Sequence, residues 1–250
     1  MSDVYPQAQP FFLKGSQDTA LLFIHGFTAS PSELYPTAQL IHDLSSCTVS
    51  APLLPGHGSN PRFLNRSSWE EWYNAVEKEL DFLMENHHWV FVGGLSMGGL
   101  LALHAGSMVK GLKRTISINA PIFNRFPLLT AISPLIGRIR TYYPKKDGPN
   151  QRILEQEGRF AYNVIPAKAF QSVMNLRNTV MEEVDKINLP VLLIQSLEDE
   201  SVHPRSVYYL QEKIKHTELI ELPGSKHVAT MGSEKEKIAR AIVDFISSYN

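Results

Sequence analysis

The chain has 250 residues, of which 43% are hydrophobic and 20% charged, and this composition predicts one large or two small folded domains rather than a disordered chain. Its 24 lysine and arginine residues nearly balance its 25 aspartate and glutamate residues, so the formal net charge of −1 argues against a nucleic-acid partner or an anionic membrane surface. The single cysteine, Cys47, excludes an intrachain disulfide and a cysteine-built metal site.

The first ten residues contain neither a basic segment nor an apolar one, so the sequence predicts no secretory signal and a cytoplasmic location. The stretch from Trp89 to Val109 lacks acidic and basic residues, but glycines, Ser96 and His104 interrupt it. We therefore expect a buried strand, turn and helix there, and no stable membrane insertion.

Short apolar runs predict buried strands, because each run is continuous rather than alternating. These runs are residues 20–24, 90–92, 115–118, 191–194 and 219–222. Apolar residues spaced three and four apart predict helices at 34–41, 69–83 and 238–249. Ser67 with Glu70, and Ser233 with Glu236, have the spacing of capping boxes ahead of the last two. Strands alternating with helices predict an open α/β fold, with a mostly parallel sheet covered by helices on both faces.

Residues 121–187 interrupt this alternation, because they contain several prolines and no clear strand. An excursion between two parallel strands lies over the edge where open α/β sheets bind ligands. We expect a core of residues 1–120 and 188–250 with a cap inserted at 121–187. The apolar residues of the cap either form a small core of their own or line a pocket. They are Phe123, Phe126, Leu128, Leu129, Ile132, Leu135 and Ile136.

A candidate nucleophile lies in the segment from Gly93 to Gly99, which contains the pattern G-x-S-x-G around Ser96. The pattern is expected by chance about 0.08 times in such a chain, so the pattern alone is weak evidence. Its position between a predicted strand and a predicted helix strengthens it. A serine between a buried strand and a helix can occupy a sharp turn that presents its hydroxyl at the sheet edge. The alternative is a simple turn of small residues.

A serine hydroxyl needs a base and a group that orients the base. His227 follows the last predicted strand, which places it at the same edge of the sheet as Ser96. His104 falls within the helix after Ser96, and we expect it to be packed or on the surface, whereas His203 and His216 should be exposed.

The orienting acid is expected on the loop after the strand at 191–194, where Glu198, Asp199 and Glu200 are adjacent. The position of this loop favours it, and the chain order serine, acid, histidine is that of the α/β-hydrolases. Position does not select among the three carboxylates.

Negative charge that develops on a substrate oxygen would need hydrogen-bond donors held in place to stabilise it. The Met97 N–H begins a helix whose dipole favours an anion, and the Phe27 N–H lies in the loop after the first predicted strand. His25 precedes that loop, and we expect it to be structural.

Together, residues 22–28, 52–58, 94–99, 199–204 and 224–228 resemble the small bacterial carboxylesterases and monoacylglycerol lipases of the α/β-hydrolase superfamily. The resemblance covers most of the chain but is weak in the cap. It implies Ser96 as nucleophile, Asp199 as acid and His227 as base, with Phe27 and Met97 as oxyanion donors. It also implies a structural role for His57 in the loop 52–58.

The resemblance implies a serine carboxylic-ester hydrolase that acts on short- to medium-chain acyl esters, monoacylglycerols among them, through an acyl-enzyme. The alternatives are an acyl-thioesterase with the same triad and a non-catalytic, hydrolase-like ligand receptor. The expected partner is a small-molecule ester, with no cofactor and no metal. The sequence leaves the oligomeric state open, with a monomer among the options.

Overall fold

The computed structural model describes residues 4–125, 140–145 and 151–248. A seven-stranded sheet forms the centre, in the order β1-β3-β2-β4-β5-β8-β9. Its strands are β1 (Phe11–Leu13), β2 (Thr19–Ile24), β3 (Thr48–Ala51), β4 (Trp89–Leu95), β5 (Thr115–Ile118), β8 (Val191–Ser196) and β9 (Thr217–Leu222). All neighbouring strands are parallel except β1 and β3. The predicted α/β fold with a mostly parallel sheet is confirmed.

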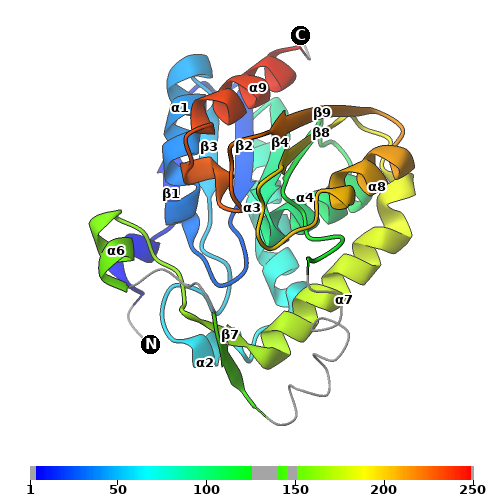
Figure 1. Cartoon of the computed structure of the whole chain (residues 1–250). Helices are drawn as coiled ribbons and strands as arrows, with labels where there is room; N and C mark the ends of the chain where they lie inside the picture. The colour runs from blue at the N-terminus through cyan, green and yellow to red at the C-terminus, as the bar shows by residue number, and fades with distance from the viewer. Residues whose placement is uncertain (1–3, 126–139, 146–150, 249–250) are drawn as a thin grey trace.

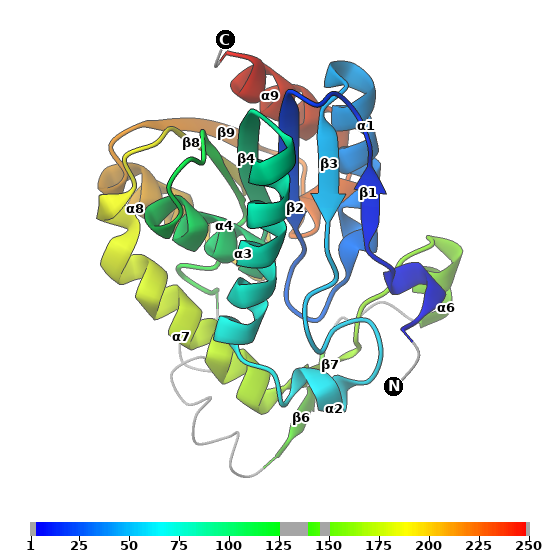
Figure 2. The same cartoon turned by 180° about the vertical axis from the view of Figure 1, so that it is seen from behind.

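Helices cover both faces of the sheet, as Figures 1 and 2 show. One face carries α1 (Tyr35–Ser45) and α9 (Lys235–Ser247), which pack against each other. The other face carries α3 (Trp69–Asn86), α4 (Met97–Met108), α7 (Ala167–Glu183) and α8 (Arg205–Lys213). Short helical segments are η1 (Pro6–Ala8), η2 (Pro31–Glu33), α2 (Pro61–Leu64), α6 (Gln151–Gln156), η3 (Val184–Lys186) and η4 (Ala229–Met231).

The central strands are buried because alternate side chains enter two separate cores. In β2, Leu21 and Phe23 pack in the core beneath α1 and α9, whereas Leu22 and Ile24 pack in the core beneath α3 and α4. Burial of each such side chain stabilises the folded state by about 1.5–3 kcal/mol relative to an exposed position. The expectation that residues 219–222 are buried on both faces was wrong, because β9 is an edge strand and only its Leu222 is buried.

The two expected capping boxes were also wrong in detail. Helix α3 is capped one residue later, where the Ser68 N–H donates to the Glu71 carboxylate at 2.8 Å. The Ser67 hydroxyl instead donates to the Leu64 carbonyl oxygen at 2.9 Å. Helix α9 begins after Glu234 without a side-chain cap, so Ser233 does not cap it.

The described part of 121–187 contains two short strands where the sequence predicts none. They are β6 (Tyr142–Pro144) and β7 (Val164–Pro166), which pair antiparallel with each other. Strands of three residues are too short to give an apolar run. Figure 2 places them beyond the edge of the sheet toward which the parallel strands run. Among the apolar residues expected in this segment, Phe123 packs against Tyr209, with ring centroids 5.5 Å apart, and the others lie outside the described residues.

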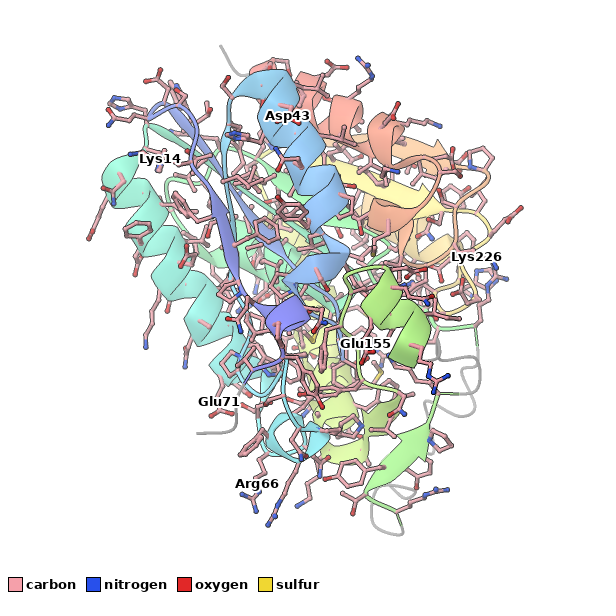
Figure 3. All side chains as sticks on the ribbon, turned by 90° about the vertical axis from the view of Figure 1, so that its left-hand side faces the viewer. Lys14, Asp43, Arg66, Glu71, Glu155 and Lys226 are labelled. Atoms are coloured by element: carbon pink, nitrogen blue, oxygen red, sulfur yellow. The ribbon has the colours of Figure 1, made fainter. Side chains whose placement is uncertain are left out.

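Many charged side chains lie on the outside of the molecule. Figure 3 shows this for Lys14, Asp43, Arg66, Glu71, Glu155 and Lys226, which are all exposed. The segment from Trp89 to Val109 forms β4, a turn and α4, as predicted. Across residues 4–125, 140–145 and 151–248, no helix combines the length and apolarity that a membrane span needs.

Candidate active site

Ser96 lies in the sharp turn that joins β4 to α4. Its backbone has φ 57° and ψ −118°, a sparsely populated conformation that costs on the order of 1–3 kcal/mol and clusters at functional sites. The Ser96 N–H donates to the Ile118 carbonyl oxygen at 2.8 Å, which ties the turn to the end of β5. The turn therefore holds the serine at the carboxyl edge of the sheet, as the G-x-S-x-G context predicts.

Two glycines around Ser96 are required by close packing. A Cβ at position 94 would lie 2.2 Å from the backbone of Gly98, so the strand and helix could not meet at this turn. A Cβ at position 98 would lie 2.0 Å from the Ile24 carbonyl oxygen, so α4 could not rest on β2. Both glycines of the pattern are therefore needed, because the turn has no room for a side chain at either position.

Three side chains that are distant in sequence meet at this edge. The Ser96 Oγ lies 3.0 Å from the His227 Nε2, and the His227 Nδ1 lies 2.7 Å from the Asp199 Oδ2. Because a carboxylate only accepts hydrogen bonds, Nδ1–H donates to Asp199 and Nε2 is left to accept from the serine hydroxyl. The neutral imidazole is therefore oriented to remove the Ser96 proton.

The acidic loop separates the roles of its three carboxylates. Asp199 is wholly buried, and its Oδ1 accepts from the N–H groups of Ser201 at 2.7 Å and Val202 at 2.8 Å. Glu200 accepts from the backbone N–H of His227 at 3.2 Å, a contact that sequence reasoning missed. Glu198 is exposed. Of the three, only Asp199 contacts the imidazole ring within hydrogen-bond distance.

The electrostatic surroundings of His227 favour its protonated form. Burial lowers the pKa of His227, but the hydrogen bond to Asp199 and the charges of Asp199, Glu200 and Glu33 raise it further than burial lowers it. The net result is a pKa above the ordinary 6.5. A histidine in this state is a stronger base than free imidazole.

The expected oxyanion donors lie next to Ser96 in sequence or next to a residue that packs on it. Met97 is the first residue of α4, so its N–H has no acceptor within the helix. Phe27 lies in the loop after β2, and across the described chain neither its N–H nor that of Met97 donates to a protein acceptor. The adjacent Gly26 packs on the nucleophile, since a Cβ there would lie 3.4 Å from the Ser96 Cβ. Two free N–H groups therefore stand beside the serine.

The loop that carries Phe27 is held from two sides. On one side, the wholly buried His25 contacts the Gly26 carbonyl oxygen through Nδ1 at 2.9 Å and accepts from the Leu54 N–H through Nε2 at 3.1 Å. On the other side, the Tyr162 N–H donates to the Thr28 carbonyl oxygen at 2.8 Å. Burial lowers the pKa of His25 to about 4, so the ring is neutral. Both nitrogens of His25 are used in holding the backbone.

The remaining histidines lie apart from the Ser96 contacts. His57 is buried beside His25 and Trp72, and its Nε2 has no hydrogen-bond partner among the described residues. His104 is packed between α3 and α7, where its Nδ1 pairs with Glu183. His203 and His216 are exposed, as expected.

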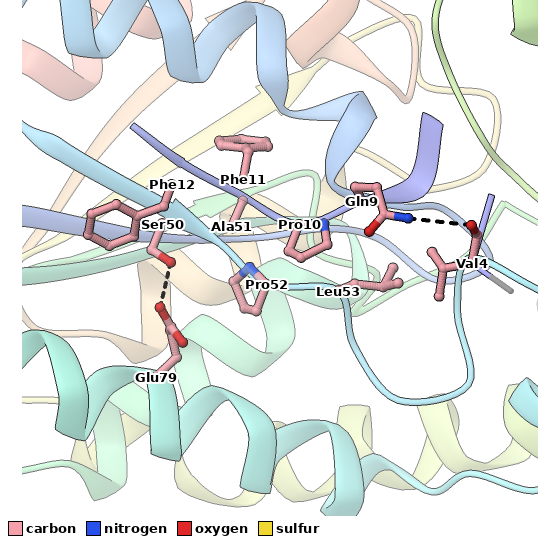
Figure 4. Close-up of a pocket in the computed structure, with 10 residues that line it drawn as sticks. All are labelled: Val4, Gln9, Pro10, Phe11, Phe12, Ser50, Ala51, Pro52, Leu53 and Glu79. Carbon is pink, nitrogen blue, oxygen red and sulfur yellow. Dashed lines mark hydrogen bonds between the residues drawn. The ribbon is translucent and has the colours of Figure 1, made fainter. Parts of the chain in front are cut away.

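A separate groove of about 500 Å³ lies between the β1–β3 edge and α3, as Figure 4 shows. The Ser50 hydroxyl in this groove donates to the Glu79 carboxylate at 2.6 Å. No histidine lines it, so it lacks the base that a serine nucleophile needs. In the described part of the chain, no group of three His, Cys, Asp or Glu side chains has the arrangement of a metal site.

Comparison with known proteins places this geometry in a family. The model of the alpha/beta hydrolase family matches residues 21–241. The chain belongs to this family. The hydrolase is 28% identical to a thermostable monoacylglycerol lipase of Bacillus sp. (strain H-257), over 100% of this chain and 99% of that protein. It is 24% identical to a carboxylesterase of Bacillus subtilis (strain 168), over 95% and 96% of the two chains.

A solved structure from a study of two metagenome-derived lipolytic enzymes, LipS and LipT, superposes on this hydrolase with a TM-score of 0.88. That structure is 28% identical, and the match covers 98% of this chain and 100% of the other. These relatives support an esterase- or lipase-type hydrolase.

Proposed function

We propose that this hydrolase cleaves short- to medium-chain carboxylic esters, including monoacylglycerols, through an acyl-enzyme on Ser96. The single observation that carries the proposal is the hydrogen-bonded series Ser96, His227 and Asp199 beside two free N–H groups. Nucleophile, base, orienting acid and oxyanion donors are the parts that acyl transfer by a serine requires.

In the proposed mechanism, the Ser96 oxygen attacks the ester carbonyl carbon while the His227 Nε2 takes the hydroxyl proton. The N–H groups of Phe27 and Met97 donate to the carbonyl oxygen as it becomes negative. The ester C–O bond then breaks, and His227 returns the proton to the leaving alcohol. A water molecule attacks the acyl-serine by the same route and releases the acid, while Asp199 stabilises the imidazolium in both halves.

The surroundings of Phe27 support an apolar acyl chain. Its ring centroid lies 6.3 Å from that of Phe170 in α7 and 6.2 Å from that of Trp72 in α3. An apolar pocket distinguishes chain lengths only by modest steps per methylene. We therefore propose a graded acyl preference rather than a sharp one.

The division into core and cap is part of the same proposal. The strand pair β6–β7 and helix α7 belong to the insertion at 121–187, and Phe170 of α7 lies against the loop that carries Phe27. This contact supports a cap that covers the ester site. The core would then comprise residues 1–120 and 188–250.

Turnover of monoacylglycerols, simple alkyl esters and acyl thioesters, measured side by side, tests the proposed substrate class. We expect oxygen esters to be cleaved with kcat/KM values well above those of matched thioesters. A preference for thioesters would overturn the substrate class and favour the thioesterase alternative. Binding of esters without release of alcohol would favour a receptor.

A further inference from the structure

Asn119 occupies an unusual position at the end of β5. It is wholly buried, and its φ of 49° places a non-glycine residue in the left-handed region. Asparagine is among the few residues that tolerate this conformation. Its N–H donates to the Ile194 carbonyl oxygen at 2.9 Å, which fixes the backbone between β5 and β8.

The Asn119 side chain joins three segments of the chain. Its Oδ1 accepts from the Ser196 N–H at 2.7 Å, at the end of β8. Its Nδ2 donates to the Ser196 Oγ at 3.0 Å and to the His227 carbonyl oxygen at 2.9 Å. The buried amide thereby satisfies both of its donors and links the two strand ends to the loop that carries His227.

The residue before Asn119, Ile118, holds the backbone of Ser96. The Ile118 carbonyl oxygen accepts from the Ser96 N–H at 2.8 Å. Two consecutive residues at the end of β5 thus hold the backbones of Ser96 and His227. No sequence motif marks them, because their contacts span 22 and 108 positions along the chain.

We propose that Asn119 is a positioning residue that sets the His227 imidazole at its distance from Ser96; this role rests on the proposed function, in which His227 is the base. Among the residues that the structure describes, the one other side chain that holds the His227 backbone is Glu200, which is exposed and accepts at 3.2 Å. Loss of the amide frees the carbonyl end of His227. The imidazole then leaves its alignment with both Ser96 and Asp199.

Asn119→Gly tests the role, because glycine accepts the left-handed backbone and removes only the side chain. We expect kcat to fall by about tenfold to a hundredfold, since small misplacements of catalytic groups cost rate on this scale, with KM for p-nitrophenyl butyrate little changed. The acid limb of kcat/KM should also move to lower pH, because an imidazole farther from Asp199 loses the contact that raises its pKa.

Ser196→Ala is the matched control, since it removes the Ser196 Oγ that accepts from the Asn119 Nδ2 and leaves the bonds of Asn119 to the Ser196 N–H and to His227. It should keep the wild-type pH profile and kcat within about twofold, because the second contact of the amide is intact. An Asn119→Gly enzyme with wild-type kcat and pH profile would overturn the role. So would equal losses in both variants, because these would indicate general loosening of the sheet.

Two further variants make every outcome decisive. Asn119→Asp keeps the acceptor for the Ser196 N–H but loses the donor to His227, so its kcat replaces that of Asn119→Gly if the latter does not fold; its acid limb is not compared, because the added carboxylate itself raises the pKa of His227. If neither folds, Asn119 acts on folding and the positioning role is wrong. Ser96→Ala separates the two proposals: activity retained there overturns the proposed function, whereas activity lost there with wild-type kinetics in Asn119→Gly overturns only the role of Asn119.

Discussion

The Nδ1 atom of His227 lies 2.7 Å from the Oδ2 atom of Asp199. The Asp199 carboxylate is fully buried, and its other oxygen accepts from two backbone N–H groups. The adjacent Glu200 faces the backbone of the same histidine rather than its ring. Three neighbouring carboxylates therefore have three different environments, and mutation can distinguish them.

Asp199→Asn should lower kcat by about ten-thousand-fold, because an amide no longer selects the productive imidazole tautomer. Glu198→Gln should leave kcat within about twofold, since Glu198 is exposed, and exposed charges act weakly through solvent. Steady-state hydrolysis of p-nitrophenyl butyrate measures both. Equal losses at positions 198 and 199 would show that the wrong carboxylate has been assigned.

The pH profile should report the raised pKa of His227. Protonated imidazole cannot accept the Ser96 proton, so kcat/KM falls as pH falls through that pKa, and the midpoint of the acid limb should lie above 6.5. Glu200→Gln removes one of the charges that raise the pKa and should move the midpoint to lower pH. Glu198→Gln is the control with an unchanged midpoint. A wild-type midpoint below 6.5 would contradict this electrostatic account.

The buried, neutral His25 should make the fold sensitive to acid. Its pKa of about 4 lies below the 6.5 of an unfolded histidine, so the unfolded chain binds more protons as pH falls. Between pH 7 and pH 5 this histidine should cost about 2 kcal/mol of unfolding free energy. Urea denaturation at the two pH values should show a smaller difference for His25→Gln than for wild type, whereas His216→Gln, at an exposed site, should match wild type. A His25→Gln difference equal to that of wild type would be inconsistent with a neutral His25.

The turn at Ser96 should not accept a side chain at position 98. Gly98→Ala places a Cβ 2.0 Å from the Ile24 carbonyl oxygen, and we expect a loss of stability of about 1–3 kcal/mol or more. At Gly224 the nearest atom to an added Cβ is 3.8 Å away, so Gly224→Ala should leave the melting temperature nearly unchanged. Thermal unfolding of the two variants measures the difference. Equal melting temperatures would show that the turn can relax.

The sheet was predictable where strands are buried on both faces, because residues such as Leu192 and Leu193 in β8 then form continuous apolar runs. Strand β3 was missed because its Ser50 is buried through a hydrogen bond to Glu79 rather than through apolar packing. Edge strands such as β1 bury less surface and carry a weaker pattern.

The meeting of Ser96 and His227 was predictable from their positions at strand ends. Ser96 and His227 each follow an apolar run in the sequence, and parallel strands end at one edge of the sheet. Glu200 and Asn119 were not predictable in the same way, because they contact His227 through its backbone. Such contacts depend on loop conformation and leave no spacing in the sequence.

The most direct measurement is the mass of the enzyme during turnover of p-nitrophenyl butyrate, with samples quenched in acid and mapped by peptide mass spectrometry. We expect a burst of p-nitrophenol and a butyryl group on the peptide that contains Ser96, with neither in Ser96→Ala. Turnover without an acylated peptide, or acylation of another residue, would contradict the account.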